Sequence, residues 1–306
     1  MSIVDRYAPS PTSDLHLGNL RTALAGWLLT HRAGGSWRLR VEDLDVTRVR
    51  AARGAAARQL RDLKDLGLAW DGEPVTQSER MEAYRDALAR LRERTYECFC
   101  TRREIEQAAS APHDDGYRPY PGTCARLSAA ERSRKRKQRP AAIRVRAEDA
   151  VFTVTDRFSG EVTATVDDFV LVRGDGVPAY NLASVVDDMY QGVTQVTRGA
   201  DLLSSAPRQA WLTTQLGGQP PAYAHIGLVT NDRGKRLAKR DGAVTLADLQ
   251  AQGWRTSDVL AELTASLGLG RHTTPHEALD AMPGLLPAAF HLPVTWTGSQ
   301  LVSLQP

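Results

Sequence analysis

The most constraining feature of this sequence lies near its beginning, where two prolines break an apolar segment and an amphipathic pattern follows at once. Pro9 and Pro11 interrupt the apolar start, because proline lacks the amide donor that a strand or helix interior needs. Five apolar side chains then recur with the period of one helix face: Leu20, Ala23, Leu24, Trp27 and Leu28. The stretch therefore predicts a strand, a loop and a helix that packs on a core.

The start of this helix is a candidate phosphate site. The first backbone amides of a helix have no partner within it and carry the positive end of its dipole, which attracts anions. His16, Gly18 and Asn19 occupy that position, and Gly18 would let a ligand approach the backbone closely. An ordinary turn with a surface histidine explains the spacing equally well.

The order of residues in this stretch resembles the first signature of class I aminoacyl-tRNA synthetases, in the form used by their glutamyl branch. The matching residues are Arg6-x-Ala-Pro-Ser-Pro-Thr12 and then Leu15-His-Leu-Gly-Asn19. Ser13 stands where that branch normally has glycine. The resemblance implies ATP-dependent activation of an amino acid, with Mg²⁺ accompanying the ATP.

Composition adds broad limits. A chain of 306 residues is typical of two domains, or of one large α/β domain with an insertion and a tail. No apolar run reaches 18 residues, which predicts a soluble protein without a membrane partner. The net charge of +3 comes from 39 basic and 36 acidic side chains, so a nucleic-acid partner would need a local patch. Three cysteines, with no signal peptide before the first strand, indicate a cytoplasmic protein whose thiols serve something other than disulfides.

The segment from residue 37 to 45 alternates like a strand and ends in three carboxylates: Glu42, Asp43 and Asp45. Carboxylates at the end of a strand in an open parallel sheet face the ligand crevice. Solvated loop charges that pair with Arg48 and Arg50 are the alternative interpretation. The resemblance implies that Glu42 holds the α-amino group of the substrate.

The three cysteines have the spacing of a metal site. Cys98 and Cys100 are one residue apart on an expected hairpin, and Cys124 returns from a turn, so they can supply three corners of a tetrahedral zinc site. The fourth corner is not determined by spacing, and His113 is the commoner type of ligand. The resemblance implies Tyr120 instead, because the glutamyl-queuosine branch carries Cys-x-Cys followed by Tyr-x-x-x-Cys. We expect one Zn²⁺ per chain, with Tyr120 bound as phenolate.

A basic run from Arg132 to Arg139 places six positive charges in eight residues. It is either a solvated helix end or loop, or a patch that contacts RNA phosphates. The segments around it have the alternation of short strands, at residues 143–146, 151–155, 161–166 and 169–172. They predict a small β-rich subdomain inserted between the two halves of a parallel sheet.

Two residues of the second half complete the expected amino-acid pocket. By the resemblance, Tyr180 and Arg198 line it, with Arg198 on the γ-carboxylate of glutamate, and Arg6 and Ser10 belong to it as well. A guanidinium fork fits a planar carboxylate better than an ammonium does. The expected pocket has cations for two carboxylates and Glu42 for one ammonium. This charge pattern matches L-glutamate.

The segment from Arg236 to Arg240 resembles the second class I signature, Lys-Met-Ser-Lys-Ser. A basic loop with a preceding glycine suits the triphosphate of ATP. Arg236 replaces the opening lysine and Ala238 the central serine, whereas Lys239, the phosphate-binding lysine, is retained. We expect Arg236 and Lys239 to bind ATP opposite His16.

Together these features predict an α/β protein with a Rossmann-like parallel sheet, an inserted zinc-bearing acceptor-type subdomain, a short helical C-terminal region and no anticodon-binding domain. The expected segments are 1–95 and 176–245 for the two halves of the catalytic domain, 96–175 for the insertion and 246–306 for the C-terminal region. The resemblance implies a truncated glutamyl branch that transfers glutamate to queuosine in the anticodon of tRNA(Asp), and we expect a monomer. The alternatives are a minimal glutamyl-tRNA synthetase that charges a 3′ end and a non-catalytic zinc-bearing RNA-binding paralogue.

Overall fold

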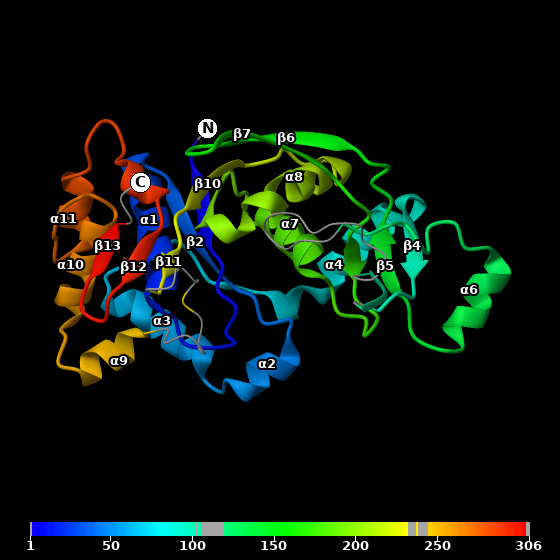
Figure 1. Ribbon diagram of the computed structural model, residues 1–306, viewed down its shortest axis with the longest axis horizontal. Helices are drawn as coiled ribbons and strands as arrows, with labels where there is room; N and C mark the ends of the chain where they lie inside the picture. The colour runs from blue at the N-terminus through cyan, green and yellow to red at the C-terminus, as the bar shows by residue number, and fades with distance from the viewer. Residues whose placement is uncertain (1, 102, 106–118, 232–236, 238–243, 304–306) are drawn as a thin grey trace. The chain divides into compact units, whose positions relative to one another are not determined.

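The computed structural model describes residues 2–101, 103–105, 119–231, 237 and 244–303. The chain forms two compact units, one made of residues 1–76, 193–203 and 222–306, the other of residues 77–192 and 204–221. Each unit is described by itself below (Figure 1). The expected boundaries at residues 96, 176 and 246 stay predictions.

The first unit contains a parallel sheet. Strands β1 (Val4–Tyr7), β2 (Ser36–Val41) and β3 (Val75–Thr76) pair in parallel, and so do β9 (Gln195–Gly199) and β10 (Ala222–Ile226). The amide of Thr194 donates to the carbonyl of Val4 over 2.9 Å, which brings β9 beside β1. The predicted Rossmann-like parallel sheet is therefore present.

Helix α1 (Leu17–Arg32) begins where the proline-broken stretch predicts. All five apolar residues of its predicted face are buried, from Leu20 to Leu28. Arg21 is equally buried and lies outside that prediction. Its guanidinium donates to the carbonyls of Gly227, Ser266 and Ala289, and so attaches α1 to the C-terminal part of the chain.

Two helices follow β2 along the chain. α2 (Val46–Ala51) and α3 (Ala55–Asp65) are separated by Gly54, whose φ of 72° lies in the left-handed region. An L-residue with a side chain rarely adopts that conformation, so Gly54 permits the break.

The C-terminal region is helical only in its first part. It contains α9 (Leu246–Ala251), α10 (Thr256–Ser266), α11 (Pro275–Asp280) and a 3₁₀ turn, η5 (Ala288–Phe290). The tail, which looks irregular in sequence, then forms β12 (Val294–Trp296) and β13 (Leu301–Ser303). β12 pairs in parallel with β11 (Val229–Thr230) and antiparallel with β13. The hydrogen bonds to these neighbours hold β12 in the strand conformation.

The second unit combines short strands with helices. An antiparallel sheet has the order β4 (Thr95–Cys98), β5 (Ala142–Val145), β8 (Val170–Val172), and β6 (Val151–Asp156) pairs with β7 (Gly160–Thr165). The four strands predicted between residues 143 and 172 are confirmed. The helical elements are η1 (Gln77–Arg80), α4 (Met81–Arg90), η2 (Arg92–Arg94), α6 (Ala129–Arg136), α7 (Tyr180–Tyr190) and α8 (Ala206–Gln215), and η3 (Ala200–Ser205) leads into α8.

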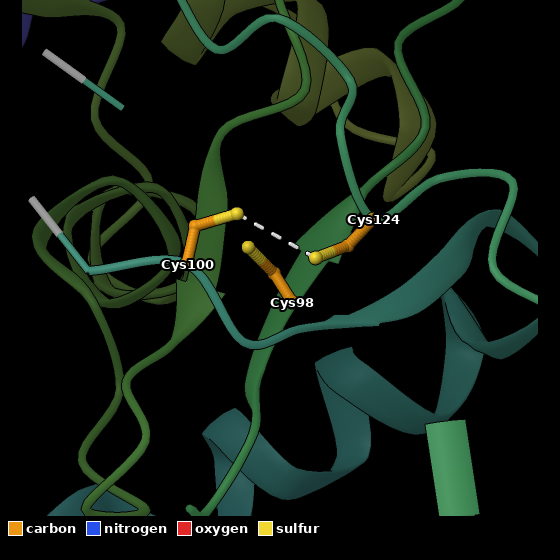
Figure 2. A group of neighbouring side chains, drawn as sticks. All are labelled: Cys98, Cys100 and Cys124. Atoms are coloured by element: carbon orange, nitrogen blue, oxygen red, sulfur yellow. Dashed lines mark hydrogen bonds between the residues drawn. The ribbon is translucent and has the colours of Figure 1, made fainter. Parts of the chain in front are cut away.

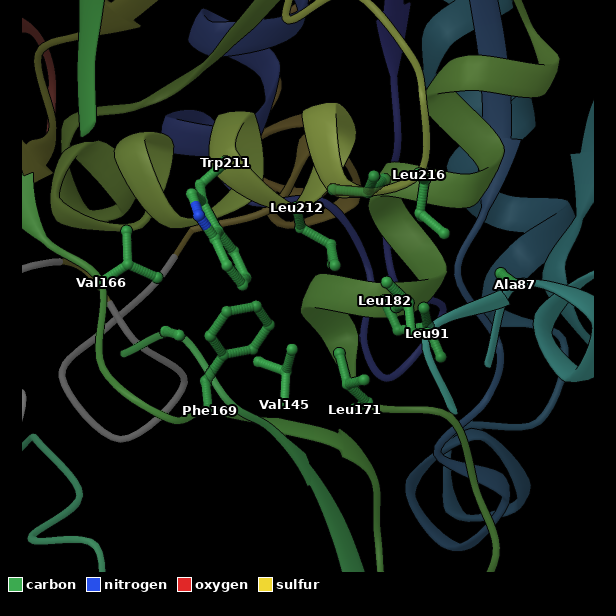
Figure 3. Packing of buried hydrophobic residues seen from close by; sticks show 12 residues of the cluster. Ala87, Leu91, Val145, Val166, Phe169, Leu171, Leu182, Trp211, Leu212 and Leu216 are labelled. Atoms are coloured by element: carbon green, nitrogen blue, oxygen red, sulfur yellow. The ribbon is translucent and has the colours of Figure 1, made fainter. Parts of the chain in front are cut away.

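The core of this unit lies between its helices and strands (Figure 3). Phe169 meets Trp211 of α8 edge to face, with ring centroids 6.2 Å apart. Leu171 of β8 and Leu182 of α7 are fully buried in the same cluster. Each such side chain contributes about 1.5–3 kcal/mol by leaving water. Val145 of β5, the strand that pairs with β4, belongs to the same cluster.

No helix in the described part of the chain is both long and apolar enough to cross a bilayer.

Candidate functional site

Three cysteines and one tyrosine form a compact group in the second unit, which we call the Cys–Tyr cluster: Cys98, Cys100, Cys124 and Tyr120. Cys98 ends β4 opposite Ala142 of β5, so the two neighbouring thiols lie at a strand end and not on the expected hairpin. The three sulfur atoms are within 4.8 Å of one another, and those of Cys100 and Cys124 are 3.6 Å apart (Figure 2). The Oη of Tyr120 lies 3.4 Å from Sγ of Cys98 and 3.5 Å from Sγ of Cys100.

The distance between the sulfurs of Cys100 and Cys124 and the two distances from the Tyr120 oxygen are close to those of a tetrahedral zinc site. Zn–S bonds near 2.3 Å and Zn–O bonds near 2.0 Å place two sulfurs about 3.8 Å apart and a sulfur and an oxygen about 3.5 Å apart. The cluster therefore has donor atoms that could hold a metal ion such as Zn²⁺. The alternative fourth ligand, His113, lies outside the described residues.

The surroundings of Tyr120 fit a phenolate ligand. The amide of Cys124 donates to its Oη over 2.8 Å, and the guanidinium of Arg144 lies 3.7 Å from the ring centroid. Asp167 accepts the Tyr120 amide over 3.1 Å and so holds the backbone. Burial raises the pKa of the phenol well above its usual value, so deprotonation needs a compensating cation nearby.

The thiols differ in their readiness to ionise. Burial raises the pKa of Cys100 to about 12. Burial also acts against ionisation of Cys124, but hydrogen bonds from the Phe99 amide and from the rest of the cluster outweigh it and lower its pKa. A metal binds the thiolate form, so these surroundings favour the form of Cys124 that could serve as a ligand.

In the first unit, His16 caps α1 with its own ring. Its Nδ1 accepts the amides of Gly18 over 3.1 Å and Asn19 over 3.4 Å, and the Asn19 side chain accepts the His16 amide in return. The helix-start amides that the sequence assigns to phosphate are thus directed at His16. Acceptance at Nδ1 places the proton of the neutral ring on Nε2, which makes Nε2–H the donor that an anion would meet.

Position 18 leaves little room for a side chain. A Cβ at this position would lie 3.0 Å from Cε1 of His16 and 3.5 Å from Cβ of Val229. The carbonyl of Val244 accepts the amide of Leu17 over 3.0 Å. Val229 and Val244 flank the second signature on either side, so the chain enters and leaves that segment beside the start of α1. Arg236 and Lys239 themselves lie outside the described residues.

The loop of the first signature is held by Gln59 of α3, a residue that the sequence interpretation missed. The side-chain amide of Gln59 donates to the carbonyls of Ser10 over 3.0 Å and Ser13 over 2.7 Å. The sequence did contain a signal for this role, because Gln59 is a polar residue on the helix face that buries Ala55 and Leu63. Ser13 does not have a positive φ, since the non-glycine residues in that region within the described chain are Glu148 and Asp149. Ser13 therefore causes no backbone strain. Ser10, which is expected to bind the amino acid, is exposed.

The two arginines expected to bind carboxylates lie close together and are buried. Arg6 is 4% and Arg198 5% exposed, and Nη1 of Arg6 donates to the carbonyl of Thr197, next to Arg198, over 3.4 Å. Arg198 donates to Nε2 of His225 over 3.0 Å and to the carbonyl of Leu202 over 3.0 Å. These contacts orient the Arg198 guanidinium.

A fully buried aspartate supports this arrangement. Asp5 accepts the amides of Arg6 and Thr197 as well as the side chain of Gln195. Burial raises the pKa of Asp5, whereas the charge of Arg6 and the hydrogen bonds from Thr197 and Gln195 act in the opposite direction. The aspartate thereby joins β1 to β9 next to Arg6 and Arg198 in the sequence of each strand.

Glu42 pairs with a residue that the sequence interpretation did not consider. Its Oε1 accepts both Nε and Nη2 of Arg40, over 3.2 Å and 3.1 Å, rather than meeting Arg48 or Arg50. Residues two apart on a strand share one face, which brings the two side chains together. Its amide donates to the carbonyl of Pro9 over 3.0 Å, so Glu42 lies beside the first-signature loop as expected. The fully buried Arg40 adds a third cation to the expected charge pattern.

Tyr180 begins α7 in the second unit and is 42% exposed.

The comparisons with known proteins agree on one family. Residues 2–280 match the family of tRNA synthetases class I (E and Q), catalytic domain. A protein of Nocardia farcinica named glutamyl-Q tRNA(Asp) synthetase is 58% identical over 92% of this chain and 90% of its own length. One of the same name from Cutibacterium acnes is 54% identical over 90% of this chain and 79% of its own length.

A solved glutamate tRNA ligase of Elizabethkingia meningosepticum, in complex with its amino acid, has the same fold. It superposes with a TM-score of 0.76 at 24% identity, over 95% of this chain and 66% of that chain. This chain thus spans slightly less than two thirds of that ligase.

Proposed function

The chain belongs to the class I tRNA synthetases of the glutamyl and glutaminyl type, and on that premise we propose that it activates L-glutamate with ATP and Mg²⁺ and transfers the glutamyl group to queuosine in the anticodon of tRNA(Asp). The observation that carries the proposal is the 58% identity, over nine tenths of both chains, to a relative named for that reaction. The expected monomeric state and cytoplasmic location stay predictions.

The proposed first step is attack of the glutamate α-carboxylate on the α-phosphate of ATP, with pyrophosphate as leaving group. No side-chain nucleophile is needed, because the substrate supplies its own, and the protein has to align the groups and stabilise phosphate charge. We assign the phosphates to His16, through Nε2–H, and to Arg236 and Lys239 of the second signature. Gly18 and Asn19 act on this site through His16, because their amides donate to its Nδ1 and so fix its ring. Val229 and Val244, on either side of the second signature, lie beside the same helix start.

The amino-acid pocket follows from the buried cations. We assign the γ-carboxylate to Arg198, whose orientation is set by His225, and the α-carboxylate side to Arg6. Glu42 remains our candidate for the α-amino group, which would then share the carboxylate with Arg40. Ser10 and Tyr180 complete the proposed set.

In the second step, a hydroxyl of the queuosine ring attacks the glutamyl carbonyl of the adenylate. An ester forms and AMP leaves with the electron pair of the broken bond. The residues that hold glutamate in the first step keep the carbonyl in place for the second.

Zinc has a structural role in this proposal. Cys98, Cys100, Tyr120 and Cys124 would hold one Zn²⁺, which would order the segment from residue 96 to 175 that we propose as an insertion. Metal analysis of freshly purified protein should find one zinc per chain. Cys124→Ser should lose the metal and loosen residues 98–124 before the parallel sheet unfolds, which limited proteolysis would detect.

The decisive test is transfer of radiolabelled glutamate to two forms of tRNA(Asp), with and without queuosine. Both carry a 3′-terminal dideoxyadenosine, which blocks charging of the 3′ end and leaves the anticodon unchanged. Label on the queuosine form alone is the expected result. A third RNA, with the same sequence and an intact 3′ end, is tested beside them. Label on this RNA alone would instead indicate a minimal glutamyl-tRNA synthetase. Absence of glutamate-dependent pyrophosphate exchange would indicate a non-catalytic paralogue.

A further inference from the structure

Helix α6 carries most of the basic run and has no buried residue. It begins with a capping box, in which Ser128 accepts the amide of Glu131 and the Glu131 carboxylate accepts the amide of Ser128. Burial of an apolar face, the usual source of helix stability in a folded protein, does not hold this helix in place. Its position must come from polar contacts.

Those contacts attach α6 to the Cys–Tyr cluster. Arg136 forms a two-pronged pair with the carboxylate of Glu97, with N–O distances between 2.7 and 3.0 Å. Arg139 donates to the carbonyl of Phe99 over 2.9 Å, and Phe99 lies between the two neighbouring cysteine ligands. The cap residue Ser128 follows Cys124 by four positions. Both ends of α6 are thereby anchored to segments that supply the cluster.

The other four cations of the run have no such role. Within the described residues, no hydrogen bond or ion pair is formed by the side chains of Arg132, Arg134, Lys135 and Lys137. Like charges three and four residues apart on a helix repel one another by a few tenths of a kcal/mol per pair. Glu131 offsets part of this repulsion, because Arg134 and Lys135 lie close enough to lower the pKa of its carboxylate, which also serves the cap. A single carboxylate leaves the run with a net positive charge, to which an external polyanion would be attracted.

We propose that α6 binds the phosphodiester backbone of the RNA substrate through Arg134, Lys135 and Lys137, and that the Cys–Tyr cluster serves as its anchor. The proposal rests on the proposed function only for the identity of the RNA. Counterions released from the backbone provide the affinity, so the contact needs no base recognition. Arg136 and Arg139 hold the helix through their contacts with Glu97 and Phe99. Arg134, Lys135 and Lys137 are then left to contact the phosphates.

The test compares two triple variants of the full chain. Arg134→Gln, Lys135→Gln and Lys137→Gln together remove the proposed contacts. The matched control removes three exposed charges elsewhere in the same unit: Arg85→Gln, Arg92→Gln and Arg94→Gln. Binding to queuosine-containing tRNA(Asp) and to an unrelated RNA hairpin is measured from 50 to 200 mM salt.

Each lost phosphate contact reduces the slope of log affinity against log salt by about 0.7–0.9, so the α6 variant should lose about 2–3 in slope on both RNAs. The ratio of wild-type affinity to variant affinity should then be about 20- to 40-fold larger at 50 mM than at 200 mM salt. The control variant should keep the wild-type slope. An α6 variant with the wild-type slope, or a control with the same loss, would overturn the proposal.

Pyrophosphate exchange with glutamate, measured without RNA, separates this proposal from the proposed function. The α6 variant should keep the wild-type exchange rate, since its three residues lie outside the assigned site. If exchange is absent in the wild type, the proposed function fails, whereas the salt slope still decides the RNA contact.

Discussion

Replacing Tyr120 by phenylalanine removes one oxygen atom from the Cys–Tyr cluster and keeps the ring that Arg144 covers. The Oη of Tyr120 lies 3.4 and 3.5 Å from two cysteine sulfurs, close to the distance of about 3.5 Å for a sulfur and an oxygen on one zinc ion. Tyr120→Phe should therefore leave three of four ligands in place, without a change in the packing of the ring.

The expected loss follows from the affinity of structural zinc. Such sites bind with an apparent free energy of about 10–16 kcal/mol, so one ligand of four contributes on the order of 3–4 kcal/mol. This corresponds to a weakening of about 10²- to 10³-fold. A water molecule in the vacated position would reduce the effect toward the lower value, and the amide of Cys124, which now donates to Oη, would have to find that water as acceptor.

Competition with a chromophoric zinc chelator at neutral pH measures this affinity directly. His113→Ala is the matched control, because His113 is the other candidate ligand in the sequence. We expect weaker binding in Tyr120→Phe and wild-type binding in His113→Ala. The reverse pattern would show that the fourth ligand is the histidine and that the proximity of Tyr120 to the sulfurs has another cause.

Three further predictions concern the assigned pocket, the second signature and the first unit's stability. Arg198→Ala should weaken transition-state binding for glutamate by on the order of 2–5 kcal/mol, because the γ-carboxylate would be desolvated without its partner; glutamate-dependent pyrophosphate exchange measures this. Lys239→Ala should slow adenylate formation by about a hundredfold or more in a pre-steady-state assay with little change in glutamate affinity, whereas Ala238→Ser should change the rate by about a factor of a few. Asp62→Asn should stabilise the protein at pH 7.5 by about 1 kcal/mol, as denaturant unfolding would show, while the exposed control Asp86→Asn should not.

The sign of the Asp62 effect follows from its environment. Burial and two neighbouring carboxylates raise its pKa from 3.8 to about 6. Between these values the folded state binds more protons than the unfolded one, so stability falls as the pH rises through that window. Asp62→Asn should remove this fall, and the gain should vanish near pH 4. A gain of equal size at pH 4 would contradict the assignment.

Unaltered kinetics in the other two variants would be equally informative. Wild-type exchange in Arg198→Ala would mean that another residue reads the γ-carboxylate. A wild-type rate in Lys239→Ala would assign the second signature to the surface of the protein and favour a non-catalytic paralogue.

The sequence alone determined those features that depend on residues close together in the chain. The apolar period of residues 20–28 places α1, alternation places β5 to β8, and the spacing of the cysteines predicts that they meet. Tyr120 came from the family resemblance and not from spacing. Such patterns reflect the geometry of one helix or strand, which successive residues share whatever the rest of the chain does. The family follows for a related reason, because its signatures are short and contiguous.

Tertiary structure decided which polar groups meet. Arg6 contacts a carbonyl 191 positions away, and Arg21 bonds to Ser266, 245 positions away. Arg144 covers the ring of Tyr120, 24 positions away, and no period in the sequence predicts this pair. A buried charge needs a partner, but the sequence does not say which one, because the chain's path in space brings distant residues together and only that path sets the charge of the site.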